Sequence, residues 1–87
     1  MIKNTRKEFR MEMVKTILYA DRDERFWAIS SNVSPSGVGI FTNRPLEAGQ
    51  EIKVTSKHLW DSPRAAHVAW SFQLNSRLFK AGIALDN

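Results

Sequence analysis

Short apolar segments separated by turn-forming residues constrain the fold of this chain more than any other feature of its sequence. Runs of this length, rich in Val, Ile, Phe and Trp and bounded by Gly, Pro, Asn or Ser, are typical of β-strands. No segment shows the sustained 3.6-residue periodicity of a long helix. The predicted strands cover residues 11–19, 25–31, 38–42, 50–55, 65–72 and 78–85. We therefore predict an all-β fold, either a small antiparallel barrel or a sandwich.

Local patterns support this assignment. In residues 50–55 the apolar Ile52 and Val54 alternate with polar neighbours, as in a strand with one buried face. The charged residues 21–25 predict a turn between the first two strands. Residues 34–37 (Ser-Pro-Ser-Gly) have the composition of a type I turn before the third strand, and residues 73–76 predict the last hairpin.

Length and composition limit the class of protein. A chain of 87 residues predicts a single domain. The absence of cysteine excludes disulfides, thiolate zinc sites and cysteine catalysis. No apolar run approaches the roughly 18 residues that span a bilayer, and the polar start does not resemble a signal peptide. We expect a cytoplasmic protein without membrane insertion.

Positive charge is concentrated at the N-terminus. The whole chain has a net charge of +4, from 13 Lys and Arg against 9 Asp and Glu. Residues 1–10 contain four basic residues and Glu8 alone as acid, a net +3, which leaves +1 for the other 77 residues. We predict a flexible basic arm over residues 1–10 and a β domain over residues 11–87. The arm either binds an anion or is an ordinary solvated terminus, and its charge is consistent with both interpretations.

Two short motifs carry candidate binding chemistry. Arg6 and Arg10 are four residues apart, a spacing that places both side chains on one side of the chain. Their guanidinium groups match both phosphate oxygens and the O6 and N7 acceptors of guanine. Asn32 and Ser34, two apart on an extended segment, offer donors and acceptors to a purine, and Gly37 permits close approach. Each motif alone also fits a basic tail or an ordinary turn.

Together, in this order, the motifs RxxxR and NxSxxG resemble those of the PilZ domain family. The resemblance covers roughly residues 5–85. Further matching segments are Val38-Gly39-Ile40-Phe41, Pro45-Leu46 with Gly49, Ile52 and Val54, then Val68-Ala69-Trp70 and Ala81-Gly82-Ile83.

This resemblance implies a six-stranded antiparallel β-barrel that acts as a bacterial receptor for cyclic di-GMP. By the same resemblance the nucleotide contacts are Arg6, Arg10, Asn32, Ser34 and Gly37, with Lys7, Ser36 and Trp70 as additional candidates. Binding would order the basic arm and relay the signal to a downstream protein. Because Lys7 stands where a second Arg is frequent, one or two nucleotides are both possible. We expect no C-terminal helix after the last strand and no cofactor.

Other classes of function are set aside. A PilZ-like adaptor that does not bind nucleotide is the alternative, and a nucleic-acid binder ranks below it. His58, His67 and Asp61 lack further ligands at metal-binding spacing, so we expect no metal site. No nucleophile elbow, P-loop or dinucleotide motif occurs, so we expect no enzyme.

The three tryptophans could suggest base stacking, as on single-strand-binding barrels. No basic and aromatic run accompanies them, and aromatic residues on strands more often belong to the core. We therefore expect the tryptophans on strands to belong to the core, and Trp60, in a loop, to be the one that is more open to solvent.

Overall fold

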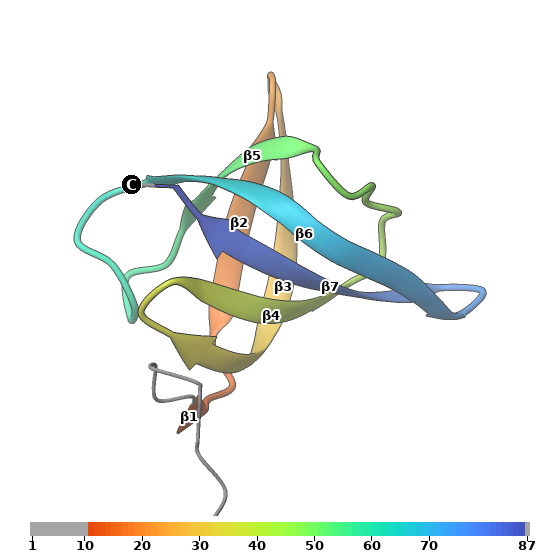
Figure 1. The fold of residues 1–87 in the computed structure, drawn as a ribbon, viewed down its shortest axis with the longest axis horizontal. Helices are drawn as coiled ribbons and strands as arrows, with labels where there is room; N and C mark the ends of the chain where they lie inside the picture. The colour runs from red at the N-terminus through yellow and green to blue at the C-terminus, as the bar shows by residue number, and fades with distance from the viewer. Residues whose placement is uncertain (1–10, 87) are drawn as a thin grey trace, which may run out of the picture.

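The computed structural model describes residues 11–86, which form seven strands and no helix (Figure 1). The strands are β1 (Met11–Glu12), β2 (Thr16–Asp21), β3 (Glu24–Ser34), β4 (Gly37–Thr42), β5 (Glu51–Thr55), β6 (Arg64–Asn75) and β7 (Leu78–Leu85). Each of the six predicted regions contains a strand. The all-β prediction is confirmed.

Six of these strands close into a barrel. They follow the order β3-β2-β5-β6-β7-β4, and β4 pairs back with β3. Every pairing is antiparallel. The seventh strand, β1, lies outside the ring and pairs with the end of β3, with Met11 opposite Val33 and Glu12 opposite Asn32. The predicted six-stranded antiparallel barrel is therefore confirmed, with β1 as an additional strand.

The prediction of one continuous strand over residues 11–19 is wrong, because the chain leaves the ladder at residues 13–15. Ser30, which is buried, occupies this gap from the facing strand. Its hydroxyl accepts a hydrogen bond from the Lys15 amide at 2.8 Å and donates to the Met13 carbonyl. An inward-facing serine thus provides hydrogen-bond partners for backbone groups of two partly buried residues, Met13 and Lys15.

The second strand is longer than predicted. Instead of ending at Ser31, β3 continues to Ser34, with a register shift between Ser30 and Asn32. Two residues, 35 and 36, then connect it to β4. The turn is where the sequence predicted it, but Asn32 and Ser34 lie on the strand that leads into it.

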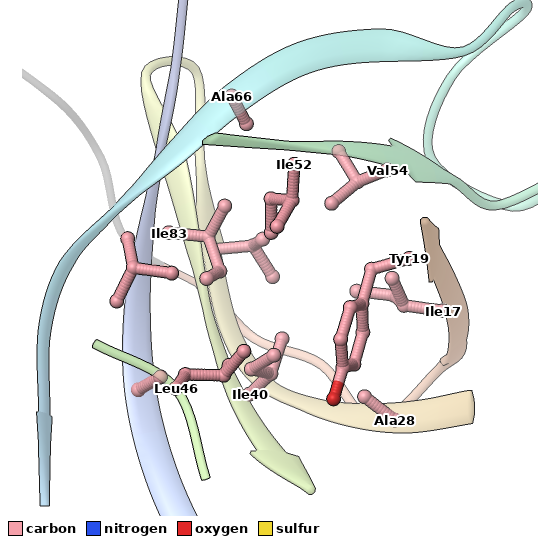
Figure 2. Close-up of a cluster of buried hydrophobic side chains, with 12 residues drawn as sticks. Ile17, Tyr19, Ala28, Ile40, Leu46, Ile52, Val54, Ala66 and Ile83 are labelled. Carbon is pink, nitrogen blue, oxygen red and sulfur yellow. The ribbon is translucent and has the colours of Figure 1, made fainter. Parts of the chain in front are cut away.

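The core fills the inside of the barrel (Figure 2). All six barrel strands contribute to it, and Leu46 adds a side chain from the loop between β4 and β5. The predicted alternation of β5 is confirmed, since Ile52 and Val54 are buried while Glu51 and Lys53 are exposed. The buried apolar residues are Ile17, Tyr19, Ala28, Val38, Ile40, Leu46, Ile52, Val54, Ala66, Val68, Ala81 and Ile83.

The expected exposure of the tryptophans is wrong. Trp60 is half-buried and packs against the core, whereas Trp27 is 66% exposed. On β3 the inward position belongs to the small Ala28, so its neighbour Trp27 faces outward opposite Leu18. The alternation of the strand overrides the general preference of aromatic residues for the interior.

Tyr19 makes folding stability dependent on pH in the alkaline range. Its ring is buried, its hydroxyl lies 2.8 Å from Thr42 Oγ1, and burial raises its pKa above 10.0. Above pH 10 the unfolded chain loses this proton before the folded protein does. The protonated Tyr19 hydroxyl therefore makes its full contribution to the free energy of unfolding below pH 10. This contribution is lost as the pH rises through the pKa of Tyr19 in the folded protein.

We expect the urea midpoint to fall above this pH by more in the wild type than in Tyr19→Phe, which has no group to titrate. Tyr19 is the single tyrosine of the chain, so tyrosinate absorbance reports its ionisation directly. If the tyrosinate absorbance of the folded protein rose with a midpoint at the ordinary tyrosine pKa of 10.0, the prediction would be contradicted.

Candidate ligand-binding site

The predicted motif residues Asn32 and Ser34 lie at the end of the β3–β4 hairpin. In the pairing of these strands, Asn32 is opposite Gly39 and Ser34 is opposite Gly37. Ser34 is largely buried, and its hydroxyl donates a long hydrogen bond of 3.4 Å to the Gly37 carbonyl. Ser34 therefore closes the turn as well as facing the surface hollow described next.

Beside this hairpin lies a hollow of about 170 Å³ over β4 and β7. Its floor lacks side chains larger than methyl, because Gly37 is paired with Ala84 and Gly39 with Gly82. A Cβ on Gly37 would lie 2.5 Å from the Ile83 carbonyl oxygen, so β4 approaches β7 as only glycine permits. The glycines give the site a flat floor of main chain.

Trp70, on β6, forms the opposite wall. It is paired with Gly82, and a Cβ there would lie 2.4 Å from the indole Nε1. The indole therefore rests over the glycine, 44% exposed, and stacks on Phe72 with 5.7 Å between ring centroids. An indole held in this way presents a π-surface beside the polar groups of the hairpin.

The only charged residue among those lining the hollow in the described part of the chain is a cation, Lys80. Its ammonium lies 5.3 Å from the centroid of the Phe41 ring. Polar groups, an aromatic wall and a positive charge around a flat floor suit a planar ligand that carries negative charge.

The hollow brings together five of the eight candidate residues from the sequence. Asn32, Ser34, Ser36, Gly37 and Trp70 all line it. The other three, in the basic arm, lie outside the described residues.

The sequence reasoning did not select three further residues of the site, Gly39, Lys80 and Gly82. Two of them occur within segments that carry the family resemblance. Their role depends on which strands are neighbours, and a local pattern does not contain that information.

The histidines take no part in this site. Between residues 11 and 86 no group of three His, Cys, Asp or Glu side chains is arranged to hold a metal ion. His67 Nδ1 lies 2.9 Å from an oxygen of Asp86, and both side chains are almost half exposed. Over the same residues, no helix has the length and apolar character needed to cross a membrane.

Comparison with known proteins agrees with this geometry. A family model described as the PilZ domain matches residues 4–86. Among solved structures, the chain is similar to the Bacillus subtilis inhibitor of motility (MotI/DgrA), with a TM-score of 0.73 and 15% sequence identity. The match covers 98% of this chain but 44% of that one, so this chain spans less than half of its length. No curated protein matches.

Proposed function

The chain belongs to the PilZ domain family, and from this premise we propose that it is a receptor for cyclic di-GMP that relays the level of this second messenger to a partner protein. The observation that carries the proposal is the convergence of Asn32, Ser34 and Trp70 on one hollow with a glycine floor. These residues come from two distant parts of the sequence, and the barrel closure makes them neighbours.

The chemistry of the hollow suits this ligand. Cyclic di-GMP has two guanine bases and a phosphodiester ring with two negative charges. The Asn32 amide has both a donor and acceptors for a guanine edge, and the Trp70 indole provides a face on which a purine can stack. Lys80 supplies a positive charge for a phosphate.

The hollow is too small to enclose the ligand alone, so we expect a second element to cover it. At about 170 Å³ it is smaller than the roughly 300–1,000 Å³ of pockets that enclose a drug-sized ligand. A ligand as large as cyclic di-GMP would lie across it and remain accessible from above. The basic arm, with Arg6, Lys7 and Arg10, supplies the chemistry of a cover.

The pairing of β1 supports a site that the two motifs share. Met11 is opposite Val33, which lies between Asn32 and Ser34. Arg10 immediately precedes Met11, so its Cα is about 3.8 Å from that of Met11. A ligand in the hollow is therefore within reach of the arm, and ordering of residues 1–10 on binding would be the signal passed to a partner.

Calorimetric titration with cyclic di-GMP tests the proposal, with GTP and cyclic di-AMP as controls. We expect micromolar or tighter binding of cyclic di-GMP alone, because only this ligand combines two guanines with a compact dianion. Binding should change the tryptophan fluorescence, and most of that change should disappear in Trp70→Phe. Absence of heat with cyclic di-GMP would contradict the proposal and favour an adaptor that works through protein contacts alone.

A further inference from the structure

Strand β6 is an interior strand along its first half and an edge strand along its second. Its residues 64–67 pair with β5, and Val68 extends this contact through hydrogen bonds with Gln50 and Gly49. Within the described part of the chain, residues 70–75 pair on one side only, with β7. Figure 1 shows this end of the β6–β7 hairpin extending away from the barrel. The backbone of residues 70–75 therefore pairs with no described strand on that side, and Ser71 meets the loop before β5 through its side chain, whose hydroxyl donates to the Leu46 carbonyl.

This free edge has only part of the usual protection against pairing. Edge strands are commonly blunted by charged residues, proline or bulges. Residues 69–75 (Ala-Trp-Ser-Phe-Gln-Leu-Asn) include no charged residue and no proline. Register shifts occur at both ends of the segment, but residues 70–73 between them keep an unbroken register with β7. Four consecutive residues are thus in regular geometry to accept another strand.

Three large apolar side chains of this segment are exposed. Trp70 is 44% exposed, Phe72 is 52% exposed, and the two rings stack on the same face. Leu74 is 45% exposed. The ammonium of Lys80, the one charged residue paired with residues 70–73, lies over Phe41 on the side of β7 away from the edge. No charge on these paired residues therefore opposes an apolar contact along the edge.

We propose that two copies of this chain associate by antiparallel pairing of their β6 edges at residues 70–72, which joins the two barrels through one continuous sheet. A second copy fits better than a charged partner because the edge offers no charge for recognition and brings no like charges together across a two-fold axis. With the axis at Ser71, each Trp70 faces the other copy's Phe72, the kind of cross-strand aromatic pair that stabilises sheets.

Sedimentation velocity of the full chain without nucleotide tests this pairing. The interface is small, so we expect a concentration-dependent dimer at about 100 μM protein. Phe72→Lys should give a monomer, since it places two like charges at the aromatic contact. Trp27→Lys is the matched control, because it changes a more exposed aromatic residue on β3, away from the edge, and should leave the dimer intact. Circular dichroism checks that both variants are folded.

Amide hydrogen exchange locates the contact. Residues 70–72 should exchange more slowly at high than at low protein concentration, and this difference should vanish in Phe72→Lys. A wild-type monomer at about 100 μM would overturn the proposal. So would a dimer that survives Phe72→Lys. Because no nucleotide is present, these outcomes are independent of whether the protein binds cyclic di-GMP.

Discussion

Replacing Arg10 with alanine should weaken cyclic di-GMP binding roughly ten- to a hundredfold, or about 1.5–3 kcal/mol. A guanidinium group binds phosphate or guanine through two parallel hydrogen bonds, and alanine removes both. Arg10 is the last residue of the arm and precedes Met11, which β1 fixes opposite Val33. The shorter tether holds Arg10 closer to the hollow than Arg6, so Arg6→Ala should have the smaller effect. Calorimetric titration of both variants measures the difference.

Arg25→Ala is the matched control for this prediction. Arg25 is exposed and lies at the opposite end of β3 from Asn32, so its replacement removes the same charge far from the hollow. Its affinity for cyclic di-GMP should equal that of the wild type. If Arg10→Ala and Arg25→Ala lost the same amount of affinity, the effect would come from the lower net charge and not from a contact at the site. Unchanged affinity in Arg10→Ala would refute the assignment of the arm to the site.

Much of the barrel could be predicted because its strands alternate clearly. Ile52 and Val54 face the core and their neighbours face solvent, as the pattern of β5 indicates. The break at residues 13–15 could not be predicted, since it depends on Ser30 from another strand. Likewise, the exposure of Trp27 follows from the alternation around Ala28, and residue-type preference pointed the other way.

The candidate site likewise contains residues that local sequence identified and residues whose role depends on the arrangement of the strands. Asn32 and Ser34 were identifiable because their spacing and chemistry are local features. Lys80 and Gly82 were not selected, because their place in the hollow depends on β7 lying between β4 and β6. Family resemblance supplied Trp70 as a candidate. Its contact with Gly82 is a consequence of cross-strand register, and the sequence alone does not specify it.

Alanine substitutions at two glycines of the hollow should affect folding stability and nucleotide binding to different extents. Gly37→Ala should lower the free energy of unfolding by about 1–3 kcal/mol, the usual cost of forcing extra atoms into a packed contact. Its Cβ would lie 2.5 Å from the carbonyl oxygen of Ile83, and this backbone atom can move only if β4 and β7 separate. Urea unfolding measures the loss. A stability equal to the wild type would show that the two strands have room to move apart.

Gly39→Ala, two residues further along the same strand, is the comparison. Its Cβ would lie 2.9 Å from Ser31 Oγ and 3.0 Å from Asn32 Oδ1, and both of these atoms belong to side chains that can rotate away. The unfolding free energy should therefore fall less than in Gly37→Ala. Cyclic di-GMP affinity should still fall, because the Asn32 amide would be displaced from the hollow. If Gly39→Ala binds the nucleotide as tightly as the wild type, the Asn32 amide does not contact the ligand in the position described, and recognition must rest on the other residues of the site.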